Sequence, residues 1–90
     1  KEDLAVVAED YITDSEVANV IRRAAGPLLE SLTLFDVYRG EQIPAGSRSL
    51  AYSLTLRAPD RTLEAKEVAV VREKIIADLQ KRLKATVRTG

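Results

Sequence analysis

The clearest pattern in the chain is a two-residue alternation that begins at Ser49 and ends at Arg57. Small or polar residues alternate with four apolar ones, Leu50, Tyr52, Leu54 and Leu56. Because successive side chains of a β-strand point to opposite faces, this pattern is typical of a half-buried strand. The segment predicts a strand with one face toward a core and a small, polar face away from it.

Two short segments are also predicted to be strands. Residues 3–9 are rich in β-branched side chains and form two apolar sets, Leu4, Val6 and Ala8 on one face and Ala5 and Val7 on the other. Residues 85–88 would supply a last, short strand. The first of these segments places Ala5 on the face that points away from the core.

A fourth strand is predicted within residues 28–39, which also show a period of two. Strict alternation divides its second half into two faces, Phe35 and Val37 on one and Leu34, Asp36 and Tyr38 on the other. We expect Phe35 and Val37 to anchor the strand against the core. Asp36 and Tyr38 would then lie on the open face, just before a loop that contains Gly40, Pro44 and Gly46.

Two helices are predicted between the strands. Thr13 and Glu16 have the spacing of a capping box, and Gly26-Pro27 is a typical helix end. The apolar stripe of this first helix consists of Val17, Val20, Ile21 and Ala24. A second, longer helix begins near Glu64, and its stripe consists of Val68, Val71, Ile75, Leu79 and Leu83.

The order strand, helix, strand, strand, helix, strand is that of an α+β, ferredoxin-like βαββαβ sandwich. Right-handed crossovers place both helices on one face of a four-stranded antiparallel sheet. The other sheet face is left open. By parity it should carry Ala5, Asp36, Tyr38, Ser49, Ala51, Ser53 and Thr55.

Composition limits the chemistry that this chain can perform. Ninety residues, of which 46% are hydrophobic, are enough for one domain, 1–90, and the chain contains neither Cys nor His. Cysteine or histidine catalysis and soft-metal sites are therefore excluded. A sequence that starts at Lys1 and contains no Met is expected to be a fragment of a larger chain, and no stretch is apolar enough to cross a membrane.

Basic and acidic residues balance at fourteen each, which argues against a strongly basic nucleic-acid-binding patch. Five arginines remain candidate phosphate contacts, namely Arg39, Arg48, Arg57, Arg61 and Arg88. Of these, only Arg57 shares the open face by parity. We therefore predict Arg57 as the phosphate contact of that face.

Five stretches, taken in order, resemble a known family. They are Lys1-Glu2-Asp3-Leu4-Ala5, Ala25-Gly26-Pro27-Leu28-Leu29-Glu30-Ser31, Leu34-Phe35-Asp36-Val37-Tyr38-Arg39-Gly40, Ile43-Pro44-x-Gly46-x-x-Ser49-Leu50-Ala51 and Asp60-Arg61-Thr62-Leu63. Together they resemble the ferredoxin-fold anticodon-binding domain that closes the beta subunit of bacterial phenylalanyl-tRNA synthetase. The resemblance covers nearly the whole chain. Glu64 and Lys84 depart from it, since the family usually has Ser or Thr at the first position and often Gly near the second.

The resemblance implies that the open face binds the anticodon stem-loop of phenylalanine tRNA. The matching positions are Ala5 beside the loop, Asp36 on the first anticodon base, Tyr38 stacked on that base and Ser49 as a polar contact. A carboxylate accepts hydrogen bonds from the N1 and N2 donors of guanine, and an unpaired base stacks well on an aromatic ring. The residue types thus suit the roles that the resemblance implies.

The resemblance also implies partners and cofactors outside this domain. The domain itself would be non-catalytic and hold no cofactor, while the parent class II ligase would use ATP and magnesium. The partners would be the rest of the beta subunit and the alpha subunit in a heterotetramer, in the cytoplasm and without a membrane.

Other interpretations of these residues stay open at this point. Tyr38 could be an ordinary surface tyrosine at a strand end, and Asp36 could bond a loop amide. Ferredoxin-like folds also serve as small-molecule sensors and oligomerisation modules. The small, polar face from Ser49 to Thr55 argues against a permanent interface, and the absence of a nucleophile–base pair argues against an autonomous enzyme.

Overall fold

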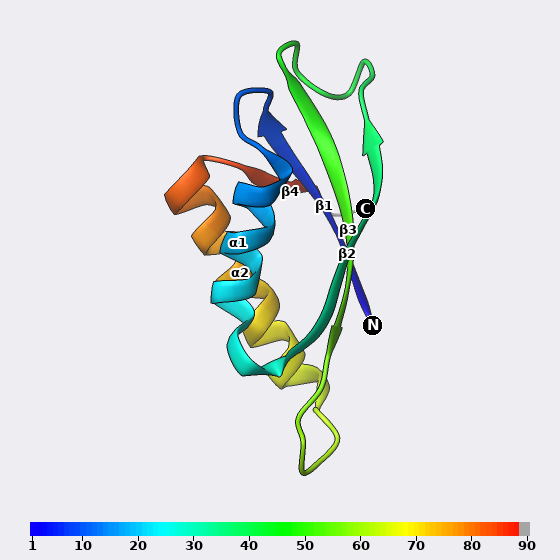
Figure 1. Cartoon of the computed structure of the whole chain (residues 1–90), viewed down its shortest axis with the longest axis vertical. Coiled ribbons are helices and arrows are strands. Elements are labelled where there is room, and N and C mark those ends of the chain that lie inside the picture. Colours follow the sequence, from blue (N-terminus) through cyan, green and yellow to red (C-terminus); the bar gives the residue numbers. More distant parts are fainter. Residues whose placement is uncertain (89–90) are drawn as a thin grey trace.

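Two helices cover one face of a four-stranded sheet in the computed structural model, which describes residues 1–88 (Figure 1). The elements are β1 (Glu2–Glu9), α1 (Asp14–Ala25), a 3-10 turn (Gly26–Leu28), β2 (Leu29–Tyr38), β3 (Ser47–Leu56), α2 (Ala65–Leu83) and β4 (Thr86–Arg88). The strand order is β2-β3-β1-β4, and each neighbouring pair is antiparallel. The predicted ferredoxin-like βαββαβ sandwich is confirmed.

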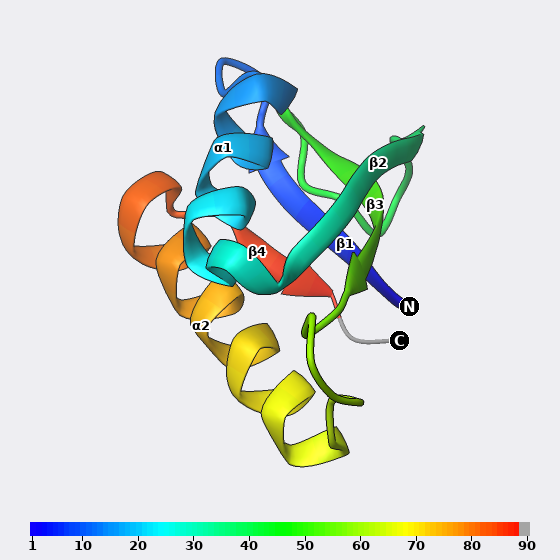
Figure 2. The same cartoon turned by 60° about the horizontal axis from the view of Figure 1, so that its bottom comes forward.

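The core lies between the sheet and the helix pair, which pack side by side (Figure 2). The sheet contributes Leu4, Val6 and Ala8 from β1 and Leu50, Tyr52 and Leu54 from β3, all buried as their parity predicts. The helices contribute Val17, Ile21, Ile75 and Leu79, among others. Burying these apolar side chains is the main favourable term in forming the sandwich.

The ends of α1 follow from its sequence. The Glu16 amide donates to Thr13 Oγ1 at 3.1 Å, and the Thr13 amide donates to Glu16 Oε1 at 3.0 Å, which completes the predicted capping box. At the other end Gly26 has φ 64° and ψ −147°, a conformation that is essentially open only to glycine. This glycine turns the chain toward β2.

The ends of α2 are built from less usual residues. The Glu64 amide donates to Glu67 Oε1 at 3.0 Å, and the Arg61 guanidinium lies 2.7 Å from the same carboxylate. The hydrogen bond from the Glu64 backbone, followed by the one from Arg61, lowers the pKa of Glu67. Lys84 ends the helix in the left-handed conformation, with φ 54° and ψ 28°. A glutamate and a lysine thus form caps that other residue types usually form.

Replacing Lys84 by glycine is expected to stabilise the fold by about 0.5 to 1 kcal/mol. A left-handed conformation costs an L-residue roughly 1 to 2 kcal/mol, and the greater freedom of glycine in the unfolded chain offsets part of the gain. Urea unfolding measures the difference. Lys81→Gly is the matched control, since Lys81 lies within α2 and glycine there should destabilise by about 1 kcal/mol. An unchanged or lower stability of Lys84→Gly would contradict this account of the cap.

Tyr52 connects the sheet to the start of α1. Its ring is buried, as its parity predicts, and its hydroxyl donates to the Asp14 carbonyl oxygen at 3.0 Å. Burial, together with the nearby negative charge of Asp14, raises the pKa of Tyr52 to about 12. The folded state therefore favours the neutral phenol.

This pKa shift predicts a loss of stability at alkaline pH. Below the ordinary value of 10.0 the contribution of Tyr52 is constant, and as pH rises to about 12 the unfolded chain loses the phenol proton first. The free energy of unfolding should fall over that window by up to about 2.5 kcal/mol, since each pKa unit corresponds to roughly 1.4 kcal/mol. Tyr52→Phe, measured by urea unfolding in the same buffers, should lack this component. If the free energy of unfolding depended on pH equally in both proteins, the raised pKa of Tyr52 would be contradicted.

Candidate nucleic-acid interface

The sheet face away from the helices carries two rows of residues that run across all four strands. Strand pairing places Asp36 opposite Ala51, Ala51 opposite Ala5 and Ala5 opposite Arg88. The next row is Tyr38, Ser49, Val7 and Thr86. The structure thus brings together four of the predicted site residues, Ala5, Asp36, Tyr38 and Ser49.

A β-bulge in β2 decides which side chains reach this face. Leu34 pairs with Tyr52, whereas Asp36 pairs with Ala51, so that Phe35 is an extra residue without a partner of its own. Leu34 therefore packs against the core, and the Phe35 side chain is 57% exposed. The prediction that Leu34 is open and that Phe35 anchors the strand from behind is wrong.

After the bulge, β2 presents the predicted polar side chains to the open face. Asp36 and Tyr38 lie there as predicted, because the extra residue shifts the alternation by one position. Val37 pairs with the buried Leu50, but it is half exposed because it lies on the edge strand near the hairpin that extends beyond the helices (Figure 1). Val37 therefore contributes little of the predicted anchoring.

Tyr38 is an accessible aromatic ring with a defined position. It is 45% exposed, and its ring lies over the backbone of Gly40, where a Cβ would come within 2.9 Å of Tyr38 Cε2 and closer still to the hydroxyl. Ser49 lies between Tyr38 and Val7 in its row and is only 4% exposed. A ligand can therefore reach the Tyr38 ring freely but Ser49 only at close approach.

The Asp36 carboxylate is exposed and, among residues 1–88, has no hydrogen-bond or ion-pair partner. The expected alternative, in which Asp36 bonds a loop amide, is not found within those residues. Its neighbours across the sheet are the methyl groups of Ala51 and Ala5. The carboxylate is thus available to accept hydrogen bonds from a planar ligand that lies close to the sheet.

Arg57 is separated from this cluster. It follows β3 at the opposite end of the sheet from Ser49, about 26 Å away along the strand at roughly 3.3 Å per residue. Its Nε lies 2.8 Å from Glu30 Oε1. Arg57 therefore lies far from Asp36 and Tyr38 along the sheet and is paired with a carboxylate, and its contact with RNA stays a prediction.

The other four candidate arginines also have partners that the sequence did not indicate. Arg39 pairs with Asp10 at 2.9 Å, and Arg61 pairs with Glu67 at 2.7 Å. Arg48 points toward the helix side and donates to the carbonyl oxygens of Glu9 and Ile12 at 3.0 and 2.8 Å. Arg88 lies on the open face beside Ala5, and it donates to the uncharged Gln42 Oε1 at 2.8 Å.

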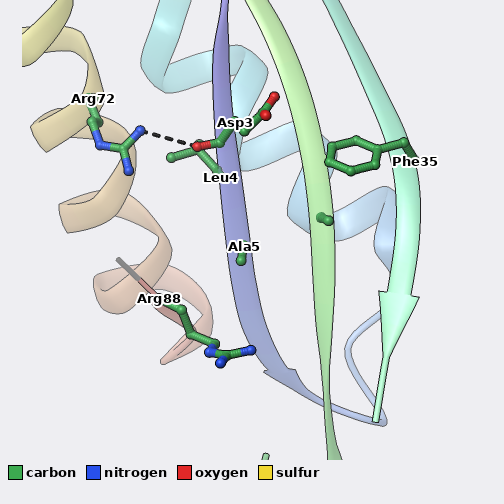
Figure 3. Close-up of a pocket in the computed structure, with 7 residues that line it drawn as sticks. Asp3, Leu4, Ala5, Phe35, Arg72 and Arg88 are labelled. Carbon is green, nitrogen blue, oxygen red and sulfur yellow. Dashed lines mark hydrogen bonds between the residues drawn. The ribbon is translucent and has the colours of Figure 1, made fainter. Parts of the chain in front are cut away.

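A shallow depression of about 380 Å³ occupies the centre of this face (Figure 3). Its floor is Ala5 and Ala51, and its rim includes Phe35, Arg88 and Asp3. At the outer edge of β1, Arg72 reaches from α2 and donates to the Asp3 carbonyl oxygen at 3.3 Å. The alternation in the sequence indicated the two alanines, and Asp3 has the same parity as Ala5, but strict alternation missed Phe35 as part of the surface.

The side chains of this surface are suited to binding a ligand through stacking, hydrogen bonds and charge. The part of the chain that the structure describes has no cluster of three or more metal-ligating side chains. It has no helix long and apolar enough to cross a membrane either. Among the residues that the structure describes, this face offers the exposed rings of Phe35 and Tyr38 around a floor of small residues. Its charged groups are the carboxylates of Asp36 and Asp3 and the guanidinium groups of Arg88 and Arg72.

The fold is a ferredoxin-like sandwich whose open sheet face is accessible to a ligand. Residues 1–88 match the family described as ferredoxin-fold anticodon binding domain, and the chain belongs to that family. The resemblance noted in the sequence motifs is confirmed.

Three relatives carry the name phenylalanine–tRNA ligase beta subunit. The protein from Synechococcus sp. (strain JA-3-3Ab) is 46% identical over 97% of this chain. Those from Moorella thermoacetica and Clostridium acetobutylicum are 49% and 43% identical, each over 96% of this chain. The match covers 10 to 11% of the length of each of these relatives.

Proposed function

We propose that this chain is the anticodon-binding domain of a phenylalanine–tRNA ligase beta subunit, and that its open sheet face binds the anticodon loop of phenylalanine tRNA. The observation that carries the proposal is the convergence of Ala5, Asp36, Tyr38 and Ser49 in two adjacent rows of one uncovered face. Family membership supports the ligand class, and the names of the relatives support the tRNA.

The roles follow from the chemistry of each group. The Tyr38 ring stacks on the first anticodon base, and the Asp36 carboxylate accepts hydrogen bonds from the N1 and N2 donors of a guanine at that position. Ala5 and Ala51 let the nucleotide approach the sheet, and Ser49 adds a polar contact beneath it. The domain performs no chemistry itself and helps to position and select the tRNA.

The remaining reaction takes place elsewhere in the proposed parent enzyme. Residues 1–90 would be a single domain of a longer beta subunit, which assembles with an alpha subunit into a cytoplasmic heterotetramer. ATP and magnesium would bind in the catalytic part of that enzyme, and this domain would hold neither.

Nuclear magnetic resonance with the anticodon stem-loop of phenylalanine tRNA tests where RNA binds. The amide signals of Ala5, Asp36 and Ala51 and the methyl signals of the two alanines should shift on titration, whereas the signals of Val70 on the outer surface of α2 should not. Shifts concentrated on α2 would refute the proposed surface. Line broadening that depends on protein concentration without RNA would instead favour self-association through the sheet, the remaining alternative for this fold.

Gly40 is expected to position the Tyr38 ring. Its backbone is not in the left-handed region that requires glycine, so the need is for space beneath the phenol. Gly40→Ala should displace the ring and weaken binding by up to the roughly 1 to 3 kcal/mol that a stacked ring contributes, with little change in stability. Isothermal titration calorimetry and urea unfolding measure the two effects. Ala45→Gly, in the same loop, is the matched control, and equal affinity of both variants and the unaltered domain would contradict the positioning role.

A further inference from the structure

Phe35 is a large apolar side chain that the bulge in β2 turns from the core to the open face of the sheet. As the unpaired extra residue of β2, it has no partner on β3, and its ring extends from β2 toward β3 (Figure 3). It is the only phenylalanine in the chain. Leu32 and Leu34 of the same strand pack against the core, whereas Phe35 does not.

The bulge has a direct consequence for the open face. In a regular strand Phe35 and Tyr38, three positions apart, would point to opposite faces. The extra residue brings both rings to one face, at the expense of regular pairing in the middle of the strand. At roughly 3.3 Å per residue the two rings start from positions about 10 Å apart along β2. Four-stranded sheets that bind single-stranded RNA commonly present two or three aromatic rings to successive bases.

The surroundings of Phe35 fit a nucleotide. The ring borders the depression of about 380 Å³ whose floor is Ala5 and Ala51, so that a flat base can lie against it without displacing a large side chain. Across the floor lies Arg88, at the β4 edge of the row that starts with Asp36. The recorded partner of its guanidinium is the uncharged amide of Gln42. The positive charge there can be neutralised by a phosphate.

We propose that Phe35 forms a second base-stacking position, separate from Tyr38, for a neighbouring unpaired nucleotide of the same RNA strand, and that Arg88 contacts the phosphate of that strand. The proposal rests on the proposed function, in that the RNA is an anticodon loop. It adds that the domain holds two bases rather than one. Base stacking supplies affinity at the Phe35 position, where the sheet offers a flat, small-residue floor.

The test uses the 90-residue domain and a set of anticodon stem-loops, each lacking the base of one loop nucleotide. Phe35→Leu should weaken binding of the intact stem-loop about 5- to 150-fold, the range expected for one stacked base. Against the stem-loop that lacks the base stacked on Phe35, Phe35→Leu should cause no further loss of affinity. Tyr38→Leu should behave in the same way, but with a stem-loop that lacks a different base. Val37→Ala is the matched control, because Val37 is a similarly exposed residue of β2 on the other face, and its affinity should be unchanged.

Two further readouts separate stacking from a structural effect. The ring signals of Phe35, unambiguous because the chain has no other phenylalanine, should move upfield when the stem-loop binds. Arg88→Gln should reduce the slope of log affinity against log salt by about 0.7, the value for one phosphate contact to a single strand. Far-ultraviolet circular dichroism confirms that each variant is folded.

The outcomes distinguish this proposal from the proposed function. If the unaltered domain fails to bind the stem-loop, the proposed function fails. If it binds but Phe35→Leu binds equally well, or if Phe35→Leu and Tyr38→Leu couple to the same base, the second stacking position is refuted while the proposed function stands.

Discussion

Replacing Tyr38 by alanine is expected to weaken binding of the phenylalanine anticodon stem-loop by about 1 to 3 kcal/mol, which corresponds to about 5- to 150-fold in the dissociation constant. The loss follows from the position of the ring, which lies on the open face in the row next to Asp36 and is 45% exposed. Fluorescence anisotropy with a labelled stem-loop measures it. Urea unfolding should give nearly the same stability for the variant, because the ring is outside the core.

Tyr11→Ala is the matched control for this experiment. Tyr11 is an equally large, exposed tyrosine, but it lies in the connection between β1 and α1, and its hydroxyl donates to Glu9 Oε2 at 3.0 Å. Its removal should leave the affinity unchanged. If both tyrosine variants lost affinity equally, or if Tyr38→Ala lost none, Tyr38 would not be the stacking residue.

Replacing Arg48 by alanine is expected to destabilise the domain by about 2 to 4 kcal/mol. The guanidinium is largely buried and donates to the carbonyl oxygens of Glu9 and Ile12. These two hydrogen bonds stabilise the turn between β1 and α1. Hydrogen bonds from a charged donor contribute roughly 1.5 to 3 kcal/mol each, and carbonyl groups left without a partner add a desolvation cost. Thermal and urea unfolding measure the change.

Arg39→Ala is the control, because Arg39 binds Asp10, the same carboxylate that Arg48 approaches, from the solvent side. An exposed ion pair of this kind contributes about 0 to 1 kcal/mol. A loss of similar size in both variants would contradict the structural role of Arg48. A loss of RNA affinity by folded Arg48→Ala would instead revive its role as a phosphate contact.

Much of the fold could be predicted because local chemistry and periodicity agree. The Thr13 capping box, the glycine at position 26 and the alternation of β3 each specify an element by short-range rules, and the element order then leaves few topologies. Glu64 and Lys84 depart from the family pattern at the ends of α2, yet α2 has the expected start and end, since tertiary packing determines helices more than their caps do.

The bulge in β2 could not be predicted from strict parity, because parity assumes that every residue of the strand is paired. The sequence does contain a signal in retrospect. Leu32 and Leu34 have the same parity as Asp36 and Tyr38, so an apolar face becomes a polar one without a change of register. One extra residue between Leu34 and Asp36 explains this change. The error concerned Phe35, which is the residue that the further proposal depends on.

The partners of the arginines could not be predicted for a different reason. The sequence position of a charged residue does not indicate its partner. Each of three arginines pairs with a distant segment: Arg48 with the β1–α1 turn, Arg57 with Glu30 and Arg39 with Asp10. Only the tertiary structure decides which positive charges remain for a phosphate. Of the five candidates, Arg88 at the end of β4 is the one that lines the depression on the open face, and the partner of its guanidinium is the uncharged Gln42.

The most direct test of the central claim compares the affinity of the 90-residue domain for two anticodon stem-loops at equal salt, one with guanine and one with adenine at the first anticodon position. Adenine stacks on Tyr38 as well as guanine does but lacks the N1 and N2 donors that Asp36 would accept. The account predicts at least about tenfold weaker binding of the adenine stem-loop, the lower end of what hydrogen bonds to a charged group contribute. Equal dissociation constants for the two stem-loops would contradict it.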